Sequence, residues 1–253
     1  MVNLIKTALL SLTLTSCTDY VMHPVSKPAI KPRQEDQPYF NESIITKTKT
    51  PEISQNKEDI YENLDQFYDP SVPLDEIIKQ CEGKQRRIVV TKSARRLSLY
   101  CDDLPLKQYK ISLGFQAVGD KLNEGDGRTP EGKYFIRSKF PGKFHKSLLL
   151  SYPNEKDAER GLQSGLINLT QYSSIVNADK QCLSPPQNTK LGGLLEIHGG
   201  GGYEDYDWTF GCIALNDEAV DEVYGHFVQL GCVRKKENDS VSLVPKVIVE
   251  IKP

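Results

Sequence analysis

The sequence predicts a mostly β domain with a few helices, of the α+β class. Short apolar or alternating segments recur from residue 86 to the end of the chain, and each is long enough for a strand. A few longer segments between them have helical periodicity. Strands and helices do not alternate regularly, which disfavours a parallel α/β architecture. With 253 residues, of which 38% are hydrophobic and 26% charged, the chain suffices for one such domain with appendages.

The N-terminus predicts export. Lys6 is followed by an apolar and hydroxyl-rich stretch that is too short for a retained membrane helix but fits a signal peptide. This stretch ends in Leu14-Thr15-Ser16-Cys17, which resembles a bacterial lipobox. We therefore expect a lipoprotein signal peptide over residues 1–17, with lipidation of Cys17. The protein would be anchored to a bacterial membrane and face the cell wall in the periplasm. A plain signal peptide with an incidental cysteine is the alternative.

Residues 18–56 form a predicted disordered tether, because they are polar, rich in proline and without apolar periodicity. Residues 57–83 predict two short helices that pack on the domain formed by residues 84–253. The helical spacing comes from two sets of apolar residues: Ile60, Leu64 and Phe67, then Leu74, Ile77, Ile78 and Cys81. Pro73 lies near the start of the second helix, where its missing N–H costs nothing.

Period-two alternation then predicts strands. Residues 88–91 and 97–101 form an expected hairpin around a polar turn, and Tyr109, Ile111 and Leu113 alternate in the next strand, which ends at Gly114. Residues 121–132 are charged and rich in glycine, which predicts a loop. Further strands are expected at residues 134–140, 148–152, 194–198 and 247–251.

Three helices are expected between and after these strands. Residues 154–163 and 168–179 have helical patterns, the second with Leu169, Tyr172, Ile175 and Val176 on one face. Asn216 is a typical N-cap for a third helix, which has apolar residues at 220, 223, 224 and 227 and ends at Gly231.

The stretch from residue 194 to 215 carries the chemistry. An apolar run ends in His198, a glycine loop follows, and a second apolar run begins at Cys212. If the two runs are neighbouring strands, His198 and Cys212 can face each other. A histidine that takes the proton of a thiol creates a thiolate nucleophile for a carbonyl carbon. Gly211 would let a substrate carbonyl approach the backbone N–H of Cys212.

Other interpretations of this stretch compete. The His-Gly-Gly-Gly run resembles a lipase oxyanion loop, but the chain has no Gly-x-Ser-x-Gly elbow. A phosphate loop lacks its Gly-Lys-Ser/Thr, and acidic residues at 204, 205 and 207 would repel phosphate. The four histidines show no zinc-ligand spacing with a second cysteine, so no metal or cofactor is predicted. A buried cysteine beside a hydrogen-bonded core histidine is the remaining alternative.

Three motifs resemble the L,D-transpeptidase (YkuD-type) family. The signature is His198-Gly199 followed by Thr209-Phe210-Gly211-Cys212-Ile213-Ala214-Leu215. Residues 125–134 resemble the Gly-Asp-x-x-Thr-Pro-x-Gly-x-Tyr segment of that family, and residues 144–153 resemble one of its branches. Together the motifs span roughly residues 88–251. The resemblance implies a β-sandwich-like fold with the cysteine and histidine in a groove.

The resemblance also implies an enzyme that acts on peptidoglycan stem peptides. Cys212 would form a thioester with the carbonyl of an L-configured centre, His198 would be general base and then acid, and the Gly199 carbonyl would orient the imidazole. The N–H groups of Gly211 and Cys212 would hold the oxyanion. An amine acceptor gives a cross-link or protein attachment, and water gives an L,D-carboxypeptidase or endopeptidase. A non-catalytic peptidoglycan-binding lipoprotein is a further alternative.

One departure from the family pattern concerns substrate recognition. Family members often have Arg two residues after the cysteine, where this chain has Ala214. We expect Arg128 to supply this charge at the rim of the Cys212 groove, because its guanidinium can hold a carboxylate through two bonds. The other expected substrate-binding residues are Thr209, Trp208 and Tyr134.

Charge and cysteine usage complete the prediction. The net charge of −2 and the lack of a long basic run give no support for a nucleic-acid partner. Four cysteines remain besides Cys17 and Cys212, and three pairings are open to them in an oxidising compartment. Cys81 with Cys101 is favoured because these residues flank the predicted hairpin, which would leave Cys182 with Cys232.

Overall fold

The computed structural model describes residues 67, 69, 71–201, 206–237 and 240–253. The predicted signal peptide with Cys17, the tether at residues 18–56 and nearly all of the first predicted helix lie outside the described residues. Within the described ranges, no helix has both the length and the apolar character needed to span a bilayer.

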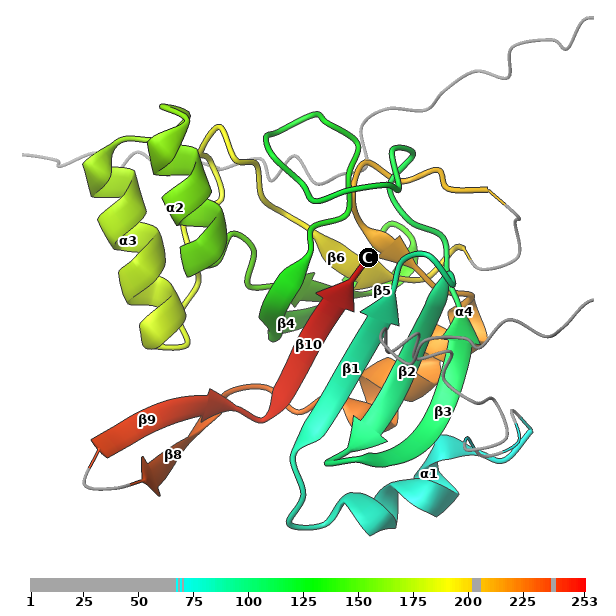
Figure 1. The fold of residues 1–253 in the computed structure, drawn as a ribbon. Helices are drawn as coiled ribbons and strands as arrows, with labels where there is room; N and C mark the ends of the chain where they lie inside the picture. Colours follow the sequence, from blue (N-terminus) through cyan, green and yellow to red (C-terminus); the bar gives the residue numbers. More distant parts are fainter. Residues whose placement is uncertain (1–66, 68, 70, 202–205, 238–239) are drawn as a thin grey trace, which may run out of the picture. The chain divides into compact units, whose positions relative to one another are not determined.

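An eight-stranded sheet forms the centre of the fold, in the order β3-β2-β1-β10-β4-β5-β6-β7 (Figure 1). Most neighbours are antiparallel, while β1 with β10 and β6 with β7 run parallel. The strands are β1 (Arg86–Thr91), β2 (Arg96–Cys101), β3 (Leu104–Lys110), β4 (Gly132–Gly142), β5 (His145–Leu150), β6 (Glu196–His198), β7 (Ile213–Ala214) and β10 (Val247–Lys252). The predicted mostly β architecture is therefore confirmed.

The hairpin of β1 and β2 is confirmed, but the strand predicted to follow it is wrong at both ends. The structure begins β3 at Leu104 and ends it at Lys110, where we expected alternation to continue to Gly114. Beyond β3 the chain leaves β2, and Ser112 exchanges two backbone hydrogen bonds of 2.9 and 2.8 Å with Ala214. The chain thus passes from one edge of the sheet to β7 at the other edge, and the sheet closes on itself as a sandwich-like layer.

One face of the sheet packs against the shorter helices and forms the main core. Leu74, Val220, Val223 and Phe227 of these helices are fully buried against apolar strand residues. The helices are α1 (Leu74–Ile77), η2 (Ile78–Cys81), α4 (Asp217–Glu222) and η3 (Val223–Phe227). As predicted, Asn216 caps α4 by accepting the N–H of Ala219 at 2.8 Å.

Two longer helices, α2 (Glu155–Gln163) and α3 (Leu169–Lys180), pack against each other beside β4 (Figure 1). Each begins with a capping box, from Asn154 and Asn168 respectively, which explains why the sequence starts helices there. Ile175 is buried between them as predicted, but Leu169 is 66% exposed. Leu169 is the first residue of α3, so it projects beyond the contact with α2.

A separate hairpin of β8 (Cys232–Glu237) and β9 (Ser240–Pro245) extends away from the sheet (Figure 1). Its base is joined to the segment after α3 by the disulfide Cys182–Cys232, and η2 is joined to β2 by Cys81–Cys101. Both pairings are the ones that the sequence favoured.

We expect the Cys182–Cys232 disulfide to be a main determinant of stability, because it closes a loop with a sequence separation of 50 residues. Replacing both cysteines by Ala should lower the free energy of unfolding by about 2–5 kcal/mol. The measurement is urea denaturation of wild type and variant, each with and without reductant. The two proteins should differ without reductant and converge with it; a difference that persists in reductant would contradict this role.

Candidate active site

The two apolar runs that carry His198 and Cys212 are neighbouring strands. In the parallel pair β6 and β7, Ile197 lies opposite Ile213 and His198 lies opposite Ala214. Side chains alternate across a strand, so Cys212, two residues before Ala214, projects to the same side of the sheet as His198. Both are buried, with 0% of Cys212 and 3% of His198 exposed. The structure therefore brings together the two residues that the spacing singled out.

The orientation of His198 is fixed by the residue that follows it. Its Nδ1 lies 2.7 Å from the carbonyl oxygen of Gly199. A carbonyl only accepts, so Nδ1 carries the proton and donates, which leaves Nε2 with the lone pair. Burial lowers the pKa of His198 below its ordinary value, against the opposing effect of this hydrogen bond. At neutral pH the imidazole is therefore neutral and able to accept a proton at Nε2.

Two aromatic rings enclose His198. Phe144, from the turn between β4 and β5, stacks on the imidazole with centroids 5.1 Å apart, and Trp208 meets it edge-on at 5.8 Å. Phe144 and Trp208 also contact each other at 5.3 Å. We predicted Trp208 as a site residue, but not Phe144. The resemblance at residues 144–153 was the signal that could have identified it.

Glu196 is a second residue that the sequence analysis missed. It lies two positions before His198 in β6, on the same side of the sheet, and is only 7% exposed. Burial raises the pKa of Glu196, while a hydrogen bond with Ser147 opposes this. The available signal was a carboxylate inside an apolar run, since burying a carboxylate costs free energy unless it is hydrogen-bonded.

The glycine loop after His198 packs directly on β7. A Cβ on Gly201 would lie 2.4 Å from the Cβ of Ala214, and one on Gly199 would lie 2.6 Å from Oδ1 of Asp217. The same Asp217 oxygen accepts the N–H of Gly200 at 2.8 Å, which attaches the loop to α4. Ala214 is fully buried, and the backbone at Gly201 packs against it.

Thr209 shapes the turn that presents Cys212. Its hydroxyl donates to the carbonyl of Cys212 at 2.7 Å and accepts the N–H of Gly211 at 3.2 Å. Thr209 is 3% exposed, which makes it part of the turn and not of a substrate surface. The expected role of Gly211 also changes, because its N–H is already bound to the Thr209 hydroxyl. The oxyanion role of the N–H of Cys212 stays a prediction.

The loop of residues 121–132 forms the wall behind Gly211. The carbonyl oxygen of Arg128 would lie 2.6 Å from a Cβ on Gly211, so glycine is needed for this approach. The Thr129 hydroxyl accepts the N–H of Gly114 at 3.0 Å and is fully buried. The predicted loop is confirmed, and its backbone contacts the residue before Cys212.

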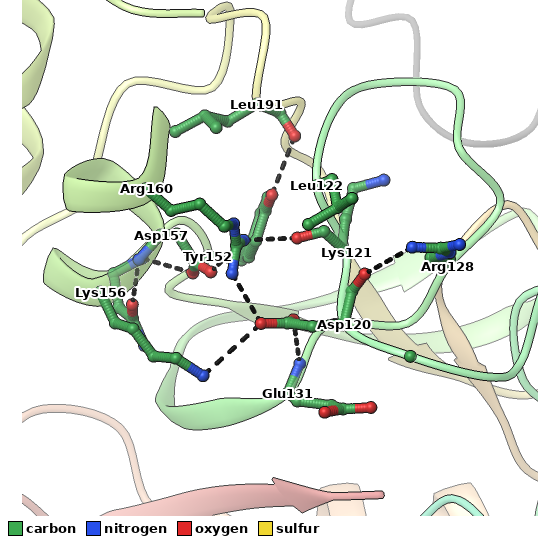
Figure 2. Close-up of polar contacts among 12 residues, drawn as sticks. Asp120, Lys121, Leu122, Arg128, Glu131, Tyr152, Lys156, Asp157, Arg160 and Leu191 are labelled. Carbon is green, nitrogen blue, oxygen red and sulfur yellow. Dashed lines mark hydrogen bonds and ion pairs between the residues drawn. The ribbon is translucent and has the colours of Figure 1, made fainter. Parts of the chain in front are cut away.

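Salt bridges hold this loop from behind. Figure 2 shows Arg160 of α2 between two carboxylates: it donates to Asp120 at 2.7 Å and to Asp157 at 3.0 Å. It also donates to the carbonyl of Lys121. Burial raises the pKa of Asp157 to about 6, although hydrogen bonds and Arg160 favour its charged form. On the other side, buried Lys92 donates to the Thr129 carbonyl and to Glu131, each at 2.9 Å.

Two of the predicted substrate-binding residues have partners inside the protein. The Arg128 guanidinium is partly buried and donates to the carbonyl of Asp120 at 3.3 Å (Figure 2). Tyr134 is 2% exposed, and its hydroxyl donates to Asp157 at 2.9 Å. Tyr134 therefore belongs to the interior beneath α2, and we correct its assignment to the substrate surface.

Cys212 is the cysteine that lies outside both disulfides of the described chain. Its Sγ points toward the carbonyl of Leu194, 4.0 Å away. Over the described ranges, no group of three or more His, Cys, Asp or Glu residues is arranged to hold a metal ion. The site thus contains a buried thiol and, on the same side of the sheet, a neutral imidazole.

Comparisons with known proteins identify the family of this chain. The family model described as L,D-transpeptidase catalytic domain matches residues 85–249, well over half of the chain. No curated protein sequence matches. Similar solved structures include the helical cell shape determining protein Pgp2 of Campylobacter jejuni, with 20% identity and a TM-score of 0.40 over 71% of this chain and 55% of that chain. Another is Bd1075 of Bdellovibrio bacteriovorus, with 17% identity and a TM-score of 0.38 over 65% and 52%.

An L,D-transpeptidase of Mycobacterium smegmatis is similar over 67% of this chain and 59% of that chain, with 12% identity and a TM-score of 0.34. The chain spans about half the length of Pgp2 and Bd1075, at 55% and 52%. The residues matched by the family model include β6, β7 and the loop between them. This chain belongs to the L,D-transpeptidase catalytic domain family, a family of enzymes that act on peptidoglycan.

Proposed function

We propose that the protein is a cysteine-dependent L,D-transpeptidase-type acyltransferase that acts on peptidoglycan stem peptides. Cys212 is the nucleophile, His198 is the general base and acid, and the Gly199 carbonyl orients the imidazole. The proposal includes export and lipid anchoring at Cys17, so that the enzyme faces the cell wall. The main supporting observation is the 2.7 Å contact between His198 Nδ1 and the Gly199 carbonyl, which leaves Nε2 as the proton acceptor.

The first half of the reaction forms a thioester. Nε2 of His198 takes the proton of the Cys212 thiol, and the thiolate attacks the carbonyl carbon of the L-configured centre. The N–H of Cys212 donates to the oxyanion that develops. The bond from carbonyl carbon to nitrogen then breaks, and Nε2 returns the proton to the departing amine.

The second half transfers the acyl group. An acceptor amine gives a proton to Nε2, attacks the thioester carbonyl and releases the Cys212 thiol, so a new amide replaces the old one. If water is the acceptor, the same steps hydrolyse the stem peptide. The half-buried rings of Phe144 and Trp208 lie against His198. They favour transfer, because apolar rings beside the site limit water near the thioester. Hydrolysis remains the second candidate, and the mass of the product distinguishes the two.

Replacing Cys212 by Ala should abolish turnover while the protein stays folded, since the change removes only the sulfur atom. The measurement is incubation of purified protein with muropeptides and analysis of product masses. Dimers indicate a transferase, shortened or separated stems a hydrolase. If wild type leaves muropeptides unchanged, the protein is a binder and the proposal is wrong. Iodoacetamide at a limiting dose should label Cys212 in wild type.

Replacing His198 by Ala should reduce kcat by about 10²–10⁴-fold, the usual contribution of general acid–base catalysis, with little change in KM. The wild-type rate should also have its acidic limb below pH 6.5. A lowered pKa keeps the imidazole neutral below that value, and only the neutral form accepts the thiol proton. A limb above pH 6.5, or a changed KM with an unchanged kcat, would assign His198 another role.

Arg128 remains our proposed partner for a substrate carboxylate, with one of its N–H groups used on Asp120. Replacing Arg128 by Lys keeps the charge but loses the planar fork, so KM should rise; replacing it by Ala should raise KM about 10- to 100-fold. Steady-state kinetics on muropeptides measures both. If kcat falls and KM is unchanged, Arg128 only braces the loop behind Gly211.

A further inference from the structure

A cavity of about 520 Å³ lies between the base of the β8–β9 hairpin and the turn from η2 into β1. It is at the ends of β1 and β10 where these parallel strands begin. Cys212 is next to β7, which is four places from β10 in the sheet. The cavity is therefore separate from the site described above.

Basic residues from both sides line this cavity. They are Lys79, Lys84 and Arg86 on the side of η2 and β1, and Lys235 and Lys246 on the side of the hairpin. Glu82 is the one acidic residue of the lining. Within the described residues none of the four lysines forms an ion pair. Among the described residues the lining thus combines five cationic side chains with one carboxylate, in a chain whose net charge is −2.

The arrangement is preformed. The disulfide Cys81–Cys101 fixes η2 on one side, and Cys182–Cys232 fixes the first residue of the hairpin on the other. Gln85 joins the two sides, because its side-chain amide donates to the carbonyls of Pro245 at 2.9 Å and Lys246 at 3.1 Å. The Arg86 guanidinium is held in place by the carbonyls of Phe227 at 2.7 Å and His226 at 3.1 Å.

Bringing like charges together around a cavity costs free energy unless a counter-charge offsets it. Lysines that are spread over a surface avoid this cost. Here the basic residues of three separate segments line one cavity with fixed walls. We propose that the cavity binds a ligand with several phosphate or carboxylate groups, remote from Cys212. Lysine ammonium groups bind phosphate and carboxylate groups as point charges. A concave site holds a compact ligand with several such groups better than a flat site does.

The test compares two variants of the full-length protein with the same change of charge. The cavity variant carries Lys84→Gln, Lys235→Gln and Lys246→Gln. The control variant carries Lys133→Gln, Lys190→Gln and Lys252→Gln, three exposed lysines outside the cavity lining. All six side chains are exposed, so both variants should keep the wild-type melting temperature; if the cavity variant does not, Lys84→Gln and Lys246→Gln are tested singly.

Titration calorimetry with tripolyphosphate and with citrate, at about 0.15 M salt, measures binding to a soluble oligoanion. Co-sedimentation with phosphatidylglycerol vesicles, against phosphatidylcholine vesicles, measures binding to a lipid headgroup. We expect saturable one-site binding of at least one probe. That binding should weaken at least about tenfold in the cavity variant and stay within about twofold of wild type in the control.

The probe that binds identifies the source of the anion: a free phosphate, a carboxylate or a headgroup. Absence of saturable binding for all three probes would overturn the proposal. Equal weakening in both variants would overturn it too, because it would reflect net charge alone. None of these measurements involves Cys212, so this inference and the proposed catalytic function are tested independently.

Discussion

Backbone atoms approach one another around Cys212 more closely than side chains would allow, and the site depends on this packing. A Cβ on Gly211 would lie 2.6 Å from the carbonyl oxygen of Arg128, and one on Gly114 would lie 2.2 Å from that of Gly127. On the other side, a Cβ on Gly201 would lie 2.4 Å from the Cβ of Ala214. Gly211 and Gly114 thus let the loop of residues 121–132 approach, and Gly201 lets the loop after His198 pack on β7. A side chain at any of them would move a loop away and shift Cys212 with it.

Loops that pack this closely need fixed positions, and hydrogen bonds and ion pairs of largely buried charged side chains fix the loop of residues 121–132. Lys92, directly after β1, and Arg160 of α2 approach the loop of residues 121–132 and donate to carbonyls and carboxylates. Buried ion pairs seldom add much net stability, because desolvation offsets their attraction. Their value here is in geometry, since the same donors that satisfy the charges also fix where the loop backbone runs. That backbone contacts Gly211, so positions distant in sequence control the approach to the nucleophile.

The sequence was sufficient to predict the elements with local signals. The Asn216 cap, the two helical segments that start near residues 154 and 168, the first hairpin and the pairing of β6 with β7 follow from a capping residue, periodicity and apolar runs. Long-range contacts were beyond these signals. Alternation at Ile111 and Leu113 looked like a continuing strand, but Ser112 pairs with Ala214 about a hundred residues away. Tyr134 was assigned to the site, because no local sequence pattern indicates that its hydroxyl donates to Asp157.

The same limit explains the mixed outcome within the site. Cys212, His198 and Gly199 lie within one short stretch of the sequence, so the motif was sufficient to predict that they belong to one site. Phe144 reaches His198 from another hairpin, and stacking between distant segments has no local pattern. The family resemblance assigned the N–H of Gly211 to the oxyanion, but in the structure this N–H donates to the hydroxyl of Thr209. Such competition for a single donor is decided by side-chain rotamers, which spacing does not specify.

Burial of the site links its chemistry to stability through two groups with opposite effects. The lowered pKa of His198 means that the unfolded chain binds more protons just below pH 6.5, so acidification through that range destabilises the fold. The pKa of Asp157, raised to about 6, means that the folded chain binds more protons between its ordinary value and pH 6. Acidification through that window stabilises the fold. The two contributions to the free energy of unfolding therefore have opposite signs.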